Sequence, residues 1–203
     1  MMKKIIKLIM LIIIVLSGIN KIYSTELNRV YNADEISKYT NNIILVNKDF
    51  PIKYNIFYQE NPIAKKELLN LIADAQKLNL NISKIYSGYR SYDKQKSLYE
   101  SYVEIHGVEE ANLFSAKPNH SEHQTGLAFD LLDNNGQLIE QEIEAKWIEE
   151  NCANYGFIVR YPKGKEAITK YQYEPWHLRY VGKEHAKNIM ENKITLEEYI
   201  LKK

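Results

Sequence analysis

The amino-acid sequence predicts an α+β fold: a single domain over residues 43–203, with a small, mainly antiparallel sheet flanked by helices. Two observations support this prediction. The chain has 203 residues, which is enough for one domain of ordinary size and an N-terminal segment. Short apolar runs of strand character and longer amphipathic helix patterns follow one another in an irregular order, with neighbouring strands and without a repeated unit.

Three elements are expected in the first part of the domain. Residues 43–46 form a short apolar run of strand character. Pro62 then opens a helix, because proline suits the first helical turn and the leucines and isoleucines after it recur on one face. Residues 82–86 predict a second strand, which ends at Gly88.

The rest of the domain continues this mixed order. Residues 93–106 predict a helix, and Gly107 lies just past its end. Residues 127–132 alternate weakly, which favours a strand, and the Asn-Asn-Gly sequence that follows favours a turn. The remaining expected elements are a helix over 143–155 that Gly156 ends, a strand over 157–159, and a last short helix after a capping box of Thr195 and Glu198.

The N-terminus has the layout of a secretory signal. Met1–Lys4 is basic, and residues 8–19 are an almost unbroken apolar run followed by polar residues. This run is shorter than the roughly 20 residues that a membrane span needs. If the apolar residues from Ile5 onward are counted with it, the segment could instead be an uncleaved membrane anchor. We expect a signal peptide or membrane anchor over 1–24, a tether over 25–42, and an extracytoplasmic location.

Charge and cysteine content exclude several classes of protein. The 27 basic and 26 acidic residues nearly balance, which argues against a nucleic-acid partner. The single Cys152 lies in an apolar helix pattern, so we expect a buried thiol that is neither a disulfide partner nor a nucleophile. Arginine is scarce and is therefore expected where a planar, permanently charged fork is needed. The arginines are Arg29, Arg90, Arg160 and Arg179.

Three residues in two dense polar segments have the chemistry of zinc ligands. His123 and Asp130 lie in the segment SEHQTGLAFD, and His177 lies in EPWH. A catalytic zinc ion takes three protein ligands from His, Asp or Glu and leaves the fourth position to water. Two imidazoles and one carboxylate meet this requirement. Asp130 is the most informative, because a carboxylate within an apolar strand is costly to bury unless it is paired or bound to a metal.

Glu174 is the candidate general base. A carboxylate within one hydrogen bond of a zinc-activated water can take its proton and pass it to the leaving amine. Glu174 stands three residues before His177, so in a regular strand the two side chains project to opposite faces unless Pro175 bends the backbone. Spacing alone leaves alternatives open: His123 and His177 could be structural histidines, and His120 is a rival ligand.

The combination of motifs resembles a known family of zinc peptidases. Ser121–Asp130 matches Ser-x-His-x-x-Gly-x-Ala-x-Asp, and Glu174–His177 matches Glu-x-Trp-His, in the order found in the D-Ala-D-Ala carboxypeptidase and dipeptidase family. Ser87–Arg90 resembles that family's Ser-Gly-Tyr-Arg segment. The chain is most similar to the VanY-type carboxypeptidases and the related L,D-carboxypeptidases. The resemblance implies the fold that these D,D-peptidases share with hedgehog-type proteins.

The resemblance also implies a role for each matching residue. His123, Asp130 and His177 would bind Zn2+, and Glu174 would act as general base and acid. Arg90 would stabilise the oxyanion of the tetrahedral intermediate, a task that suits a fixed fork of donors. The side chains implied to contact the peptide are Ser121, Gln95 and Trp176, although Trp176 could instead pack behind the metal ligand.

The implied activity is removal of the terminal D-Ala from peptidoglycan stem peptides that end in D-Ala-D-Ala, with no cofactor beyond zinc. We expect a monomer. Three alternatives remain: an L,D-carboxypeptidase that acts on tetrapeptide stems, a cell-wall endopeptidase, and a zinc- or wall-binding module without turnover. Glu174 argues against the module, which has no chemical need of this carboxylate. Lys170 stands where the family pattern has a glycine, directly before Tyr171. This difference could change the loop over the site, and with it the substrate preference.

Overall fold

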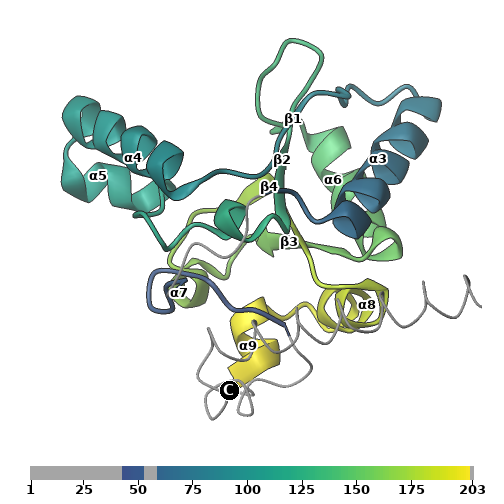
Figure 1. Ribbon diagram of the computed structural model, residues 1–203. Coiled ribbons are helices and arrows are strands. Elements are labelled where there is room, and N and C mark those ends of the chain that lie inside the picture. Colours follow the sequence, from purple (N-terminus) through teal and green to yellow (C-terminus); the bar gives the residue numbers. More distant parts are fainter. Residues whose placement is uncertain (1–42, 53–58, 202–203) are drawn as a thin grey trace, which may run out of the picture. The chain divides into compact units, whose positions relative to one another are not determined.

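A four-stranded antiparallel sheet lies at the centre of the domain that begins at residue 43 (Figure 1). The structure is a computed structural model that describes residues 43–52 and 59–201. Every pair of neighbouring strands is antiparallel, which confirms the predicted α+β class. The strands run in the order β1-β2-β4-β3, with β1 at Tyr86–Ser87, β2 at Ala128–Leu131, β3 at Phe157–Tyr161 and β4 at Glu174–Tyr180.

The expected signal or anchor over 1–24 and the expected tether over 25–42 lie outside the described residues. Within the part of the chain that the structure does describe, no helix is both long enough and apolar enough to cross a membrane.

The register of β2 and β4 separates core residues from site residues. Phe129, Leu131 and Leu178 belong to the buried apolar core. Because side chains alternate along a strand, Asp130 and His177 point away from that core. The two residues also pair directly across the strands. Antiparallel pairing therefore brings together side chains that lie 47 positions apart in the sequence.

Two helices cover the apolar face of the sheet (Figure 1). The helix α3 spans Pro62–Lys77, as predicted, and Asn61 caps it by accepting hydrogen bonds from two backbone amides of its first turn. The helix α6 spans Glu142–Asn151 and continues as the 3-10 helix η3, Cys152–Tyr155, so the helix predicted over 143–155 changes its geometry in the last turn. Cys152 is buried in this core, as expected.

A helical pair projects from the sheet on the side away from α3 and α6 (Figure 1). The first helix, α4, spans Tyr92–His106, close to the predicted bounds. The sequence did not predict the second helix, α5, which spans Val108–Phe114. Gly107 was interpreted only as the end of α4, but with φ at 82° it ends one helix and begins the next.

Two predicted strands differ in the structure. Residues 43–46 are not a strand, although Ile43, Leu45 and Val46 are buried. The backbone carbonyl of Ile44 accepts a hydrogen bond from the Arg179 side chain instead of from a neighbouring strand. Of the strand predicted over 82–86, only Tyr86 belongs to a strand, the two-residue β1 that pairs with β2. Apolar residues form a strand only where a neighbouring strand pairs with them.

The C-terminal part follows the sequence more closely. Thr195 and Glu198 form the predicted capping box: each side chain accepts a hydrogen bond from the other residue's backbone amide. The box precedes the last helix, α9. The remaining elements are the 3-10 helix η2 at Glu122–Thr125 and the helices α7 at Glu166–Thr169, α8 at Lys183–Glu191 and α9 at Leu196–Leu201.

Gly126, the one glycine of the motif that carries His123, is predicted to tolerate no side chain. Its φ is 68°, and an added Cβ would lie 2.2 Å from the carbonyl oxygen of Gln59. Gly136 is the matched control, with φ at 79° and no atom within 4 Å of the added Cβ. Gly126→Ala should lower the free energy of unfolding by about 3 kcal/mol or more, and Gly136→Ala by about 1 kcal/mol. Equal losses in denaturant unfolding would show that the contact with Gln59 does not constrain the turn.

Candidate metal centre and active site

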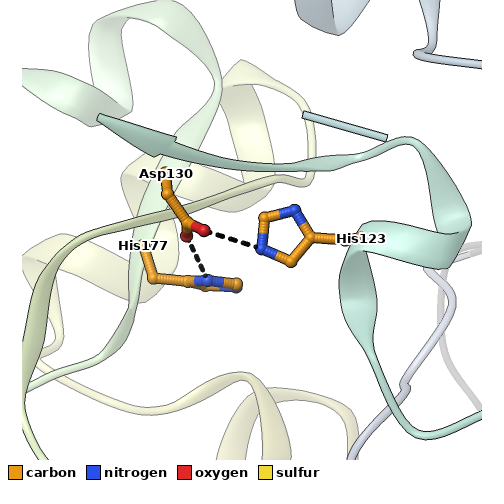
Figure 2. A group of neighbouring side chains, drawn as sticks. All are labelled: His123, Asp130 and His177. Atoms are coloured by element: carbon orange, nitrogen blue, oxygen red, sulfur yellow. Dashed lines mark hydrogen bonds and ion pairs between the residues drawn. The ribbon is translucent and has the colours of Figure 1, made fainter. Parts of the chain in front are cut away.

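His123, Asp130 and His177 meet on the face of the sheet that points away from the apolar core (Figure 2). His123 comes from η2, Asp130 from β2 and His177 from β4. One ligand atom from each of the three lies within 4.8 Å of the others, and all three residues are buried. The Asp130 carboxylate lies between the two rings, with Oδ2 3.1 Å from Nε2 of His123 and Oδ1 2.8 Å from Nδ1 of His177.

A backbone contact fixes which nitrogen of His123 faces this centre. Nδ1 of His123 lies 2.7 Å from the carbonyl oxygen of Gly88. Since a carbonyl only accepts, Nδ1 carries the proton and donates it to this oxygen. The lone pair of Nε2 is then directed toward Asp130. The Ser-Gly-Tyr-Arg segment thus orients a metal ligand that lies 35 positions away in the sequence.

The three groups change one another's ionisation. Burial opposes ionisation of Asp130, yet His123 and His177 hold the pKa of its carboxyl well below the usual range. Burial lowers the pKa of His123. Burial also disfavours the charged form of His177, but hydrogen bonds to Asp130 and Glu122 outweigh it and raise the pKa of His177 to about 9. The arrangement therefore attracts a positive charge, which is a proton on His177 or a metal cation.

A β-bulge places Glu174 on the same side as His177. Glu174 opens β4 and lines the same cavity as the three ligands. Between two paired positions, one residue of β3 faces three residues of β4, including Pro175, which has no amide to give to the ladder. The irregularity lets Glu174 and His177 line the same cavity despite their three-residue spacing. The register changes between the pairs Tyr161 with Glu174 and Val159 with Leu178.

The Glu174 carboxyl is tuned for proton transfer near neutral pH. Burial raises its pKa to about 7, and the charge of Asp130 adds to the rise. His177 and Lys48 act in the opposite direction. A metal cation at the neighbouring ligands would lower the pKa from this raised value, since it favours the ionised form. A buried carboxyl with such a pKa is suited to act first as a base and then as an acid.

The ligands and Glu174 lie in a cavity of about 300 Å³. All four of the other residues that the sequence implied for the site also line it: Arg90, Gln95, Ser121 and Trp176. The cavity extends beyond them to apolar side chains of α4 and α5 and to the loop after β2. These further lining residues include Leu98, Tyr102, Phe114 and Leu138.

Arg90 and Gln95 form a connected pair within this cavity. The Arg90 guanidinium donates to the side-chain oxygen of Gln95 at 2.8 Å and lies 3.7 Å from Asp130. The amide nitrogen of Gln95 donates to the carbonyl of Ala116. Both ends of the Gln95 amide are therefore engaged within the protein, which suits a support for Arg90. A contact of Gln95 with the peptide stays a prediction. Trp176 also belongs to the apolar core, so it packs behind the site and lines it at once.

Other candidates from the sequence are placed elsewhere. His120, the rival ligand, lies outside the group of metal-binding side chains, and its Nδ1 lies 2.8 Å from the carbonyl of Asn47. Lys170 occupies a left-handed position with φ at 63°, which explains why glycine suits this point of the family pattern. Its ammonium pairs with Asp49 on the surface.

Comparison with known proteins assigns the family. Residues 58–183 match the model of the VanY family, described as D-alanyl-D-alanine carboxypeptidase. The chain belongs to this family. YodJ of Bacillus subtilis (strain 168) is 40% identical over an alignment of 203 residues, which covers 89% of this chain and 74% of YodJ. A D-alanyl-D-alanine carboxypeptidase of Enterococcus faecium is 34% identical over 186 residues, covering 80% of this chain and 58% of that protein.

Solved structures related to this VanY-family chain fall into two groups. The LdcB LD-carboxypeptidase is 51% identical with a TM-score of 0.75, and the match covers 78% of this chain and 84% of that chain. A variant of the vancomycin-resistance D,D-pentapeptidase VanY, in complex with Zn(II), is 31% identical with a TM-score of 0.67. The match covers 77% of this chain and 97% of that chain. This VanY-family chain is a zinc carboxypeptidase, and its buried group of two imidazoles and one carboxylate fits that metal.

Sequence reasoning missed several residues that shape this site. Tyr161 stacks on the ring of His177, with centroids 5.0 Å apart, and Tyr171 stacks on Tyr161. Glu122 lies between two buried arginines and faces His177. The scarcity of arginine was the one signal that pointed to this part of the structure. No periodicity indicated which carboxylate the arginines pair with.

Replacing any one ligand by alanine should remove the metal. In His123→Ala, Asp130→Ala or His177→Ala, we expect zinc affinity to fall by more than about 100-fold, beyond the loss typical of changes outside the ligand shell. His120→Ala is the control and should keep its zinc. Elemental analysis of the purified proteins gives the occupancy. Full occupancy in all three ligand variants would contradict the assignment of the metal site.

The raised pKa of Glu174 also predicts a pH-dependent difference in stability. A carboxyl whose pKa rises on folding costs nothing below its unfolded pKa of 4.5, and its full cost is present above its folded pKa of about 7. With zinc removed by a chelator, Glu174→Gln should therefore match the wild type near pH 4 and exceed its stability by up to about 3 kcal/mol near pH 8. Thermal melts across this range test it. If the difference in stability between Glu174→Gln and the wild type did not change with pH, burial would not be the cause of the raised pKa of Glu174.

Proposed function

We propose that this protein removes the terminal D-Ala from peptidoglycan stem peptides that end in D-Ala-D-Ala. The observation that supports this most strongly is the buried Glu174, with a pKa near neutrality, in the same cavity as the His123, Asp130 and His177 group. Membership of the VanY family supports the reaction class and the substrate class.

The proposed mechanism assigns chemical tasks to the zinc ion, Glu174 and Arg90. A zinc ion, when bound, supplies a Lewis acid for the scissile carbonyl and lowers the pKa of a water molecule. Glu174 accepts a proton from the attacking water and delivers it to the leaving amine of D-Ala. Arg90 presents fixed N–H donors to the developing oxyanion, held in place by Gln95. The closed surroundings strengthen both electrostatic effects, because little water is present to screen them.

A second candidate activity is an L,D-carboxypeptidase that removes D-Ala from tetrapeptide stems. The observation that favours it is the higher identity to solved L,D-carboxypeptidases, 51% for LdcB and 49% for DacB, than to VanY structures, at 31% and 33%. Both activities use the same metal chemistry and differ in the residue that precedes the scissile bond.

We further propose that the protein acts as a monomer outside the cytoplasmic membrane, exported or anchored by residues 1–24. The basic start and apolar run of that segment support export. A wall-peptide substrate is consistent with the same location.

One assay separates the candidate activities. Purified protein is incubated with pentapeptide and tetrapeptide stems, and the products are identified by mass. Loss of one D-Ala from the pentapeptide supports the first proposal, and loss of D-Ala from the tetrapeptide supports the second. Internal cleavage would instead indicate an endopeptidase.

Glu174→Gln should retain zinc and fold but lose turnover, because an amide cannot accept the proton. We expect kcat to fall by at least about 100-fold, the usual worth of a positioned general base. Glu191→Gln, on the exposed surface of α8, is the control and should keep full activity. A loss smaller than about tenfold would mean that another carboxylate is the base.

Amidation of the peptide's C-terminus tests whether the enzyme is a carboxypeptidase. The free carboxylate needs a charged or polar partner in a closed site, and Arg90 and Ser121 are the proposed partners. Amidation should cost about 1.5 to 3 kcal/mol in kcat/KM, the usual worth of a charge-assisted hydrogen bond. Equal cleavage of the amide and the free acid would contradict the carboxypeptidase proposal.

A further inference from the structure

Glu122 is a buried carboxylate whose two oxygens have different partners. It precedes the ligand His123 in the chain, and its side chain is fully buried. Oε1 accepts two hydrogen bonds, from Nε of Arg160 at 2.8 Å and from Nη1 of Arg179 at 2.7 Å. These charge-assisted bonds fix the orientation of the carboxylate.

The other oxygen of Glu122 faces a metal ligand. Oε2 lies 3.5 Å from Nε2 of His177, with both atoms buried. Within the part of the chain that the structure describes, neither atom has a hydrogen-bond partner, and each is left facing the other. The separation is slightly longer than an ordinary hydrogen bond and too short for a bridging water. Because a buried polar atom without a partner is costly, each atom is the natural partner of the other. This arrangement places a carboxylate behind the metal-facing imidazole.

The position of Asp130 determines what this contact does. Nδ1 of His177 faces Asp130 and the metal centre, so Nδ1 must offer its lone pair to a metal ion. The proton of a neutral imidazole is then on Nε2, which faces Glu122. We propose that Glu122 is a positioning residue: by accepting the Nε2 proton of His177, it holds the ring in the tautomer that binds zinc. The proposal rests on the metal centre alone and not on which peptide is cleaved.

An amide in place of Glu122 should reverse this effect. The two arginines offer only donors, so the single oxygen of a glutamine is held by them. The amide NH2 then faces Nε2 of His177 and favours a lone pair there. The proton moves to Nδ1, where it blocks the metal. Glu122→Gln should thus weaken zinc binding although the side chain keeps its size.

Glu197 provides a matched control in the same buried network. It pairs with the other side of the Arg160 guanidinium, at 2.6 and 2.9 Å, and does not contact His177. Glu197→Gln therefore removes one buried negative charge beside Arg160, as Glu122→Gln does, but leaves the contact with His177 in place. A role limited to the stability of the network predicts the same result for both variants.

The first test is a zinc titration of the full-length chain against a competing chelator. Glu122→Gln is expected to weaken zinc affinity by about 10- to 100-fold, as removal of a partner behind a ligand does. Glu197→Gln is expected to stay within about threefold of the wild type. Equal losses in the two variants, or an unchanged affinity in Glu122→Gln, would overturn the proposal.

The second test needs no variant, so it remains decisive if Glu122→Gln does not fold. Long-range 1H–15N spectra of the zinc-loaded wild type report which nitrogen of His177 carries the proton. The proposal expects the proton on Nε2, and a proton on Nδ1 would overturn it. Neither test measures peptide hydrolysis, so a failure of the proposed function leaves both results interpretable.

Discussion

The structure depends most on the burial of one carboxylate, that of Asp130. A carboxylate in an apolar strand is stable only with charged or hydrogen-bonding partners, and Asp130 finds them in two imidazoles. This requirement fixes the register of β2 against β4, since Asp130 and His177 must pair directly. It also fixes the turn at Gly126, which returns the chain from His123 to β2. The same contacts that stabilise Asp130 make up the ligand set for zinc.

A second buried charge group surrounds this centre. Arg160 and Arg179 are completely buried, and their partners are Glu122 and Glu197. Such pairs contribute little net stability relative to an apolar core, because desolvation offsets their attraction. They do restrict geometry: the group joins η2, β3, β4 and α9 through directional bonds. The group thereby restricts the position of Glu122, which lies beside His123 in the chain and faces His177.

The sequence predicted the chemistry of the site better than its geometry. His123, Asp130 and His177 could be found because a zinc ligand set needs particular residue types, and these appear in dense polar segments. The side on which Glu174 projects depends on a two-residue bulge in β4, which pairing with β3 decides and local sequence does not. Residues 43–46 were interpreted as a strand because they are apolar, whereas the structure buries them without a ladder. The partners of the buried arginines are determined by tertiary packing, so sequence periodicity could not identify Glu122 as one of them.

The central claim is that two imidazoles and one carboxylate, drawn from η2, β2 and β4, hold a single catalytic zinc ion. Zinc K-edge absorption spectroscopy of the metal-loaded protein tests this claim most directly, because multiple scattering counts the imidazoles around the metal. The account predicts a four-coordinate zinc with two imidazole ligands and the remainder oxygen. A third imidazole, or a sulfur ligand from Cys152, would contradict it.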